Sequence, residues 1–397
     1  MKILWMSTIF LHPANRGGRI RTLNLLRELN QWHEVHYLAL QNPYELEGFA
    51  RSREYSAQSY SVSHNPPERG SVLGAMQASA SLLSPLPLAV SRYYVPELKR
   101  KASQLMKTIS FDRIVCDFLA AAPNVPHLED AILFQHNVET IIWRRQQEHA
   151  RNLIERFFFG VQARKMFAFE RDVCRRVRHI IAVSKIDADR MRSLFGVDRI
   201  SHIATSVDIE FFRRPAQVER FASLCFLGSM DWIPNMDAVT WFTEAILPRI
   251  WKQVPDCTFA IIGRNPPAQF VALAERDHRI RVTGTVDDIR PHLFGSLVSV
   301  VPLRVGGGTR LKIYEAMAAR VPVVSTRVGF EGLEGEQKTV VLADSEEEMA
   351  DACVDLLRDS RRREQIAEAA WQMVSSRFKS EVVARDFCRI LDNVGHN

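Results

Sequence analysis

The sequence lacks the features that mark several special classes of protein. It has no run of about eighteen apolar residues, which excludes an ordinary membrane-spanning helix. Its six cysteines are scattered without CxxC spacing, which argues for a reducing compartment and against a disulfide framework or a zinc site. No expected strand is followed by G-x-G-x-x-G, so a dinucleotide-dependent oxidoreductase ranks last among the enzymes considered. Tandem repeats and low-complexity tails are also missing.

The composition is that of an ordinary globular protein. Apolar residues make up 46% of the chain and charged residues 25%. The net charge of +6 suits nucleotide phosphates, an anionic lipid surface or a nucleic acid, and it does not choose among them. The N-terminal MKILWMSTIF is apolar, but the apolar part is short and no small-residue cleavage site follows. We interpret it as a first strand and expect a cytoplasmic protein.

Strand and helix patterns alternate along both halves of the chain. Residues 2–7 read as a buried strand, and a loop containing Gly18 leads into an amphipathic helix. The alternation restarts after residues 200–215, which look like a connection. At 397 residues the chain is too long for one ordinary core. The sequence therefore predicts an α/β protein with two Rossmann-like, doubly wound parallel-sheet domains that face a cleft.

One stretch of the second half carries the most informative pattern. We expect a strand at 298–301, a loop almost without side chains at 305–309, a helix from Arg310, and a second strand at 322–326. Glycines let the backbone N–H groups before a helix approach an anion closely. Arg310 and Lys312 add positive charge at a helix start, where the dipole disfavours cations unless an anion is bound. The pattern predicts a phosphate site, with a plain βα turn as the simpler alternative.

Two short sequences make this pattern more specific, Glu315-Ala316-Met317-Ala318 and Pro322-Val323-Val324. With the glycine triplet, Arg310 and Lys312, they resemble the donor-nucleotide motif of GT-B glycosyltransferases, in particular the large retaining family 4 and its Gly-Gly-Gly-Thr-Arg-x-Lys subgroup. The chain departs from the commoner motif at Gly307, which stands where most members have an acid. The resemblance covers the second half well and the first half loosely.

The resemblance implies three parts and a donor site. Residues 1–205 would form an acceptor-side domain, residues 206–378 a nucleotide-sugar donor domain, and residues 379–397 a final helix that packs back on the first domain. Gly228 and Ser229 would lie near the leaving phosphate. The residues expected at the donor are Gly18, Gly228, Ser229, Arg264, Arg304, Gly307, Gly308, Thr309, Leu311 and Glu315.

Three of these residues have expected roles of their own. Arg264 would lie near the base, as would residues 285–288. Glu315 shares a helix face with Lys312, and an acid just past a phosphate loop can accept bonds from a ribose diol. Arg304 is a candidate for binding a phosphate, and it could equally be a surface arginine without a role in binding.

His136 is the candidate from the first half of the chain. It follows an expected strand at 131–135 and precedes a helix, at the edge where open α/β sheets hold ligands. The alternative is a buried histidine bonded to backbone, with Asn137 as the cap of the next helix. The sequence His136-Asn137-Val138-Glu139 resembles the family's histidine at the donor sugar, which implies that His136 contacts and positions the transferred sugar.

The expected chemistry is stabilisation of a departing nucleoside diphosphate. Fixed N–H groups, Arg310 and Lys312 would offset the charge on the β-phosphate without a metal. We therefore expect His136, Lys312 and Arg310 as the catalytic residues. Asp187 and Asp189 form a DxD, but acids that open a helix complement its dipole and residues two apart do not face each other, so we reject a metal site. No cofactor is expected, because the nucleotide-sugar is a substrate.

Substrates and partners stay open at this stage. The donor would be a UDP-, GDP- or ADP-sugar, and the acceptor a carbohydrate or a lipid-linked intermediate of bacterial polysaccharide or glycolipid synthesis. A nucleotide-sugar epimerase on the same scaffold is one alternative. Residues 140–178 form a basic, aromatic helical stretch, which allows peripheral contact with the inner face of a membrane as a minority interpretation. A nucleic-acid-binding protein is less favoured, and residues 70–83 are expected to form a helix that lines the cleft.

Overall fold

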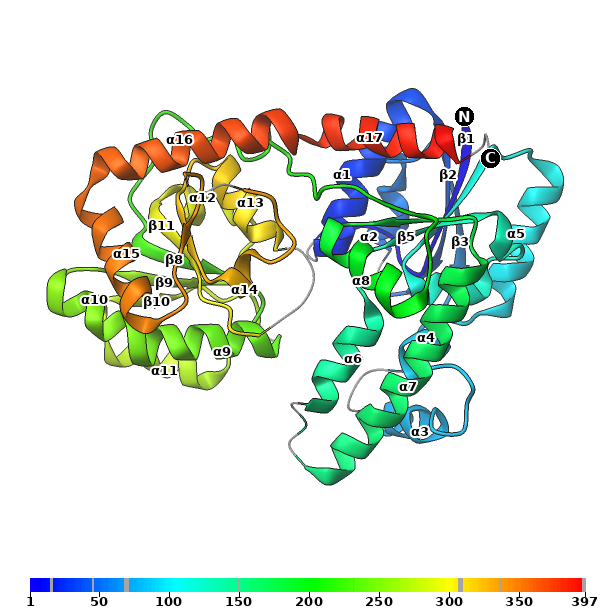
Figure 1. The fold of residues 1–397 in the computed structure, drawn as a ribbon, viewed down its shortest axis with the longest axis horizontal. Helices are drawn as coiled ribbons and strands as arrows, with labels where there is room; N and C mark the ends of the chain where they lie inside the picture. Colours follow the sequence, from blue (N-terminus) through cyan, green and yellow to red (C-terminus); the bar gives the residue numbers. More distant parts are fainter. Residues whose placement is uncertain are drawn as a thin grey trace. The chain divides into compact units, whose positions relative to one another are not determined.

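The computed structural model describes residues 1–14, 17–44, 46–67, 71–148, 150, 152–230, 232–305, 310–335 and 338–394 (Figure 1). The chain divides into two compact units. Unit 1 comprises residues 1–204 together with 383–397, and unit 2 comprises residues 205–382. Each unit is built around one parallel sheet, so we describe each by itself.

Unit 1 contains a parallel sheet in the order β3-β2-β1-β4-β5-β6-β7. The chain order reverses between β1 and β4, which is the topological switch point of a doubly wound fold. The strands are β1 (Lys2–Ser7), β2 (Glu34–Gln41), β3 (Gln58–Ser63), β4 (Arg113–Asp117), β5 (Ala131–Gln135), β6 (His179–Ala182) and β7 (Ile200–His202).

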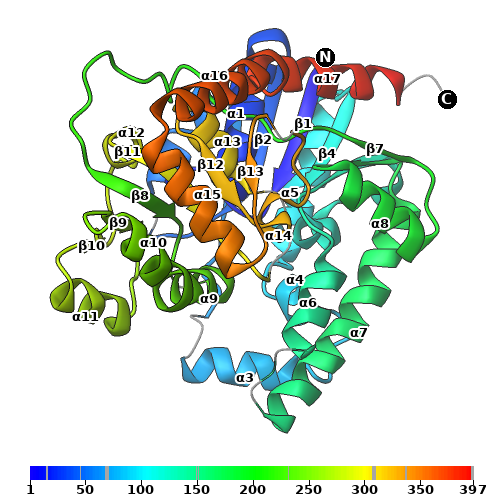
Figure 2. The ribbon, with the colours of Figure 1, turned by 60° about the vertical axis from the view of Figure 1, so that its left-hand side comes forward.

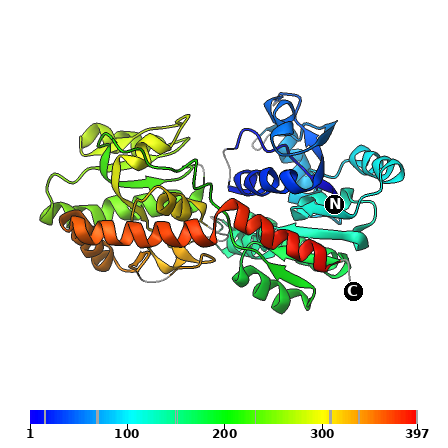
Figure 3. The ribbon, with the colours of Figure 1, turned by 90° about the horizontal axis from the view of Figure 1, so that it is seen from above.

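Both faces of this sheet are buried, as its apolar strands require. In β1 the side chains alternate, so that Ile3 and Trp5 enter one core while Leu4 and Met6 enter the other. The first core is covered by α1 (Gly17–Trp32) and α17 (Ser380–Asn393), which lie side by side in Figures 1 and 3. Phe387 of α17 packs against Trp5 at a centroid distance of 5.7 Å.

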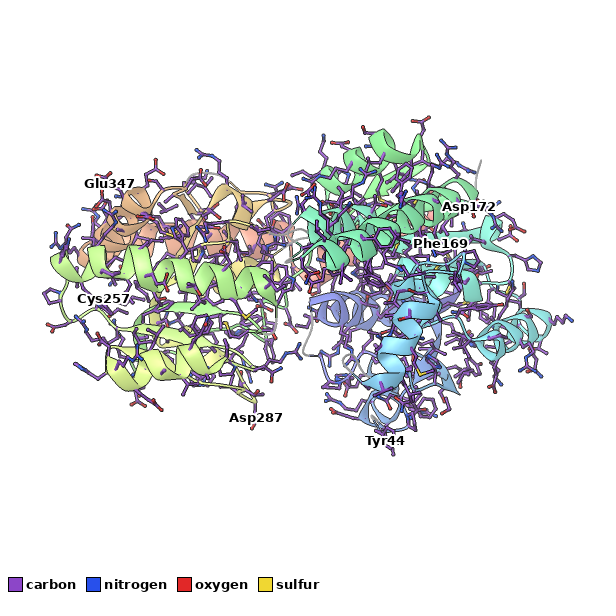
Figure 4. The ribbon with its side chains drawn as sticks, turned by 90° about the horizontal axis from the view of Figure 1, so that it is seen from below. Tyr44, Phe169, Asp172, Cys257, Asp287 and Glu347 are labelled. Atoms are coloured by element: carbon purple, nitrogen blue, oxygen red, sulfur yellow. The ribbon has the colours of Figure 1, made fainter. Side chains whose placement is uncertain are left out.

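The second core lies under α5 (Pro96–Thr108), α7 (Leu153–Arg176) and α8 (Lys185–Phe195). Figure 4 shows Phe169 of α7 among packed side chains and Asp172 at the outer edge of the unit. The remaining helices of unit 1 are α2 (Glu47–Ala50), α3 (Val72–Ala80), α4 (Leu88–Ser91) and α6 (Glu139–Glu148), with 3-10 turns η1 (Ser52–Glu54), η2 (Leu119–Asn124) and η3 (Leu128–Asp130).

Unit 2 repeats the architecture with the sheet order β10-β9-β8-β11-β12-β13, again parallel. Its switch point lies between β8 and β11. The strands are β8 (Ala222–Leu227), β9 (Phe259–Ile262), β10 (Ile280–Val282), β11 (Ser296–Val301), β12 (Val323–Ser325) and β13 (Val341–Leu342). The strand expected at 298–301 is therefore central to the sheet.

Helices cover both faces of the second sheet (Figure 1). The expected helix at 235–251 is present as α9 (Ile233–Trp241) and α10 (Leu247–Gln253), joined by a π turn, η4 (Phe242–Ile246). The other helices of unit 2 are α11 (Ala268–Arg276), α12 (Arg290–Phe294), α13 (Leu311–Ala318), α14 (Arg327–Phe330), α15 (Glu346–Arg358) and α16 (Ser360–Arg377).

The predicted fold class is confirmed, since both units are α/β layers around parallel sheets with the doubly wound strand order. The basic stretch 140–178 forms two helices, α6 and α7. The helix expected at 70–83 is present as α3, but none of its residues is buried. Within the described residues, no helix is long and apolar enough to cross a membrane.

Candidate active site

The loops that follow β8 and β11 flank the switch point of unit 2, where open parallel sheets hold their ligands. Gly228 and Ser229 come directly after β8, and Arg304 follows β11. The helix α13 then begins at Leu311, so Arg310 and Lys312 lie at its start. Gly307, Gly308 and Thr309 lie outside the described residues. The topology alone therefore brings two of the predicted loops to one sheet edge.

Lys312 is the centre of the polar contacts at this edge. Its Nζ donates to Asn235 Oδ1 of α9 at 3.0 Å, and Asn235 Nδ2 donates to the Ser229 carbonyl at 2.8 Å. Asn235 is buried, so its amide links the lysine to the β8 loop without solvent. A side chain at Gly228 would meet both groups, because its Cβ would lie 2.7 Å from Asn235 Nδ2 and 2.8 Å from Lys312 Nζ. Glycine at position 228 therefore leaves room for the ammonium of Lys312 and the amide of Asn235.

The charge of Lys312 is poorly compensated. Burial, followed by the neighbouring charge of Arg310, lowers the pKa of Lys312 to about 7. The ammonium lies 4.2 Å from the centroid of the Phe226 ring, a contact that favours the charged form weakly. An anion bound at this edge would restore the charge, so the site is electrostatically prepared for one.

Glu315 lies one turn further along α13. Burial raises the pKa of its carboxyl to about 7, and the charge of Lys312 opposes that shift. Leu311 is buried, so the core fixes the start of the helix. The ribose contact predicted for Glu315 stays a prediction.

Arg310 is buried to 5% exposure beside the β8 loop. Its guanidinium carbon lies 5.4 Å from the centroid of the Trp232 ring, within cation–π range. Trp232 itself keeps 39% of its surface exposed. An aromatic ring and two cations therefore gather around the β8 loop.

The loop after β9 is tied to the same place. Arg264 Nε donates to Ser229 Oγ at 2.7 Å, and Met230 N donates to the Arg264 carbonyl at 2.9 Å. A Cβ at Gly263 would lie 1.8 Å from the Gly228 carbonyl oxygen, so only glycine permits this approach of two backbones. Arg264 is therefore hydrogen-bonded to the predicted phosphate loop, and its predicted place near the base stays a prediction.

Arg304 and the 285–288 loop, which we also predicted at the donor, make ion pairs with other side chains. Arg304 forms a bidentate ion pair with Asp237, at 2.5 and 3.1 Å, so its guanidinium already has an anionic partner. This favours the surface-arginine alternative. In the 285–288 loop, Asp288 pairs with Arg290, and Figure 4 shows Asp287 pointing outward at the edge of unit 2.

In unit 1 the predicted His136 is part of a buried network at the carboxyl ends of β1, β4 and β5. Its Nε2 lies 2.8 Å from Asp117 Oδ1, and Arg21 lies 3.0 Å from its Nδ1. Because arginine can only donate, the proton is on Nε2 and the ring is neutral. Burial lowers the pKa of His136, which agrees with that state. Both ring nitrogens are therefore engaged, and contact with a sugar stays a prediction.

Phe118 covers one face of the His136 ring, with centroids 3.8 Å apart. Its φ of 67° is a conformation that bulky residues rarely adopt, so packing must hold it. A Cβ at Gly18 would lie 2.6 Å from the Phe118 ring. Close packing against Phe118 thus explains why a glycine stands at position 18. Its predicted place beside the donor phosphates stays a prediction.

The helix cap after His136 differs from the one considered in the sequence. The N–H groups of Glu139 and Thr140 donate to Glu170 of α7, which also accepts from Thr140 Oγ1 and Gln135 Nε2. Glu170 is fully buried, so it holds the turn after β5 from a neighbouring helix. No short-range sequence signal pointed to Glu170 or to Asn235, because each acts across a long separation along the chain.

No cluster of three or more candidate metal ligands occurs among the described residues. Asp187 lies in the first turn of α8, where its N–H donates to the hydroxyl of the N-cap residue Ser184. All six cysteines are free.

Comparisons with known proteins extend this description. Residues 222–359 match the family described as Glycosyl transferases group 1. A protein described as an uncharacterized 44.6 kDa protein in the cps region of Klebsiella pneumoniae is 22% identical over 405 residues, which cover 96% of this chain and 97% of that protein.

Solved structures resemble the whole chain. HepE from Anabaena in complex with UDP has a TM-score of 0.69 at 13% identity and covers 99% of this chain and 100% of its own. Sucrose-phosphate synthase from Thermosynechococcus elongatus has a TM-score of 0.71 at 12% identity, with 99% of both chains covered. WaaG, a glycosyltransferase involved in lipopolysaccharide biosynthesis, has a TM-score of 0.62 at 12% identity, with both chains fully covered. The family match lies within unit 2, and these neighbours show that the whole chain has the two-domain GT-B fold.

Proposed function

We propose that the protein transfers a sugar from a UDP-sugar to a carbohydrate or lipid-linked acceptor, with retention and without a metal, during synthesis of a bacterial capsule or related polysaccharide. The observation that carries the proposal is the placement of Lys312 by Asn235 against Gly228, at the switch point of the second sheet. Retention rests on the resemblance of the Glu315-Ala316-Met317-Ala318 motif to the retaining family.

The chemistry follows from charge. Departure of a nucleoside diphosphate leaves negative charge on the β-phosphate, and a positioned cation in a partly dry site stabilises that charge most strongly in the transition state. Lys312 would supply the cation, and Arg310 would add a second. Because burial lowers the pKa of the free Lys312 to about 7, binding of the diphosphate must also restore its proton, which makes the affinity depend on pH.

The choice of donor and acceptor rests on the comparisons. HepE was crystallised with UDP and with UDP-glucose, which favours uridine over guanosine or adenosine. The Klebsiella relative is described as belonging to a cps region, which favours a capsule precursor as acceptor. We propose a hexosyl donor and action at the cytoplasmic face of the membrane, with peripheral contact by unit 1.

The proposal is tested with the purified full chain. UDP should raise the melting temperature more than GDP or ADP. With a UDP-hexose and an extracted lipid-linked acceptor, release of UDP should require the acceptor. Lys312→Ala should lower turnover about 10²–10³-fold, whereas Lys252→Ala, an exposed lysine on α10, should not change it. Wild-type turnover in Lys312→Ala, or an isomerised nucleotide-sugar made without acceptor, would overturn the proposal.

A further inference from the structure

Unit 1 exposes an unusual group of large apolar side chains on two helices. Val72, Leu73 and Met76 of α3, Leu83 just after it, and Leu153, Ile154 and Phe157 of α7 are each between 63% and 93% exposed. Single exposed apolar residues are normal, but a cluster of this kind marks a surface that meets something apolar. We call these seven residues the apolar tip.

The two helices present their apolar residues in the same way. In α3 the residues stand at i, i+1 and i+4, and in α7 Leu153, Ile154 and Phe157 have the same spacing, which places each set on one helix face. Figures 1 and 2 show α3 and the start of α7 projecting from the same end of unit 1. The apolar tip is therefore one region built from two elements.

Hydrogen bonds from α7 hold the turn that follows α3 in place. Lys165 of α7 donates to the carbonyls of Ser81, Leu82 and Ser84 at 2.6–2.8 Å, and Gln162 Nε2 donates to Ser81 Oγ at 2.9 Å. These bonds fix the turn after α3 to α7, while Val72, Leu73 and Met76 of α3 stay exposed.

The distribution of charge around the apolar tip indicates which kind of partner it binds. Residues 70–91 contain no Asp, Glu, Lys, Arg or His, which is exceptional for a segment whose helix buries no residue. Residues 140–169, by contrast, contain six Lys or Arg and two Glu, a formal net charge of +4. Exposed Arg156 lies between Ile154 and Phe157. An apolar surface with a basic border is complementary to acyl chains under anionic headgroups.

We propose that the apolar tip docks unit 1 onto the surface of a bilayer that contains anionic phospholipid. With nine residues, α3 is too short to span a bilayer and would lie in the interface. A second copy of the chain is a poorer occupant, because it would bring two strongly basic helices together. The inference deepens the proposed function, since it supplies a means of reaching a lipid-linked acceptor.

The test measures sedimentation of the full chain with vesicles of phosphatidylcholine, with or without 30% phosphatidylglycerol and with no sugar donor present. We expect binding that needs phosphatidylglycerol and weakens with salt. Leu73→Ser should weaken it at least about tenfold, in line with the loss of one buried leucine side chain. Arg156→Gln should weaken it about fivefold.

A matched pair controls for side-chain type. Val72→Ser should weaken vesicle binding, whereas Val271→Ser, an exposed valine on α11 of unit 2, should leave it unchanged. The UDP-induced rise in melting temperature, measured in every variant, reports folding and nucleotide binding separately. Wild-type vesicle binding in Leu73→Ser, or equal binding without phosphatidylglycerol, would overturn the docking proposal. A dimer that Leu73→Ser converts to a monomer, without vesicle binding, would assign the apolar tip to a second copy instead.

Discussion

The substitution Gly228→Ala tests how closely the β8 loop and Lys312 fit together. The new Cβ would lie 2.7 Å from Asn235 Nδ2 and 2.8 Å from Lys312 Nζ, whereas ordinary contact begins at 3.4 Å. The ends of the two side chains must therefore move by about 0.6–0.7 Å, derived from those distances. Both are flexible, so the fold should tolerate the change and Tm should fall by less than about 3 °C.

Binding should suffer much more than stability. A displaced ammonium loses a charge-assisted hydrogen bond to phosphate, worth about 1.5–3 kcal/mol, which is about 10–150-fold in Kd for UDP. Isothermal titration calorimetry measures this directly. Gly160→Ala is the matched control, because its Cβ would meet Gln147 Nε2 at 2.7 Å in unit 1. Unchanged UDP affinity in Gly228→Ala would refute the role given to this glycine and to Lys312.

Three further predictions address charge, the α6 cap and the α17 contact. The pKa of free Lys312 is about 7 and a bound diphosphate favours its charged form, so the complex holds more protons than the free protein. UDP affinity should therefore fall about tenfold per pH unit above 7. A flat profile in titrations from pH 6.5 to 8.5, or the same slope in Lys312→Met, would contradict this. Glu170→Gln should lower the free energy of unfolding by about 2 kcal/mol or more, because an amide cannot accept all four bonds that the carboxylate accepts. Denaturant unfolding measures this loss, and exposed Asp172→Asn on the same helix is the control. Equal stability of the two variants would refute the capping role of Glu170. Phe387→Ala should cost about 3–5 kcal/mol by the same measurement, since the ring packs against Trp5 in the core of unit 1; a loss below about 1 kcal/mol would show that α17 contributes little to that core.

The sequence was sufficient for the fold class, because its strands are apolar on both faces and its loops recur at strand ends. Residues 298–301, for example, are almost wholly apolar and β-branched, and they form part of the central strand β11. Parallel strands buried on both faces carry this signal locally. The order of the strands then follows from the few topologies that parallel sheets allow.

The contacts of the site were much less accessible to sequence reasoning. Lys312 was singled out because it lies beside a glycine triplet, but its partner Asn235 is 77 residues away and carries no motif of its own. Glu170 caps a helix 30 residues earlier, where the neighbouring Asn137 was the local alternative. Such partners are set by tertiary packing, which no short window of sequence contains.

The same limit applies to α3. An apolar segment at 70–83 predicts burial, and we expected it to line the cleft. The structure instead leaves every residue of α3 unburied. Hydrophobicity indicates that a surface seeks an apolar environment, but it does not say whether the protein or another phase supplies it.

The central claim is that Lys312 and the loop after β8 hold the diphosphate of the donor. A crystal structure of the full chain soaked with UDP tests this most directly. We predict the β-phosphate within hydrogen-bonding distance of Lys312 Nζ and beside Gly228 and Ser229. Electron density for UDP at any other place, with the Lys312–Asn235 bond undisturbed and no phosphate near it, would contradict the account.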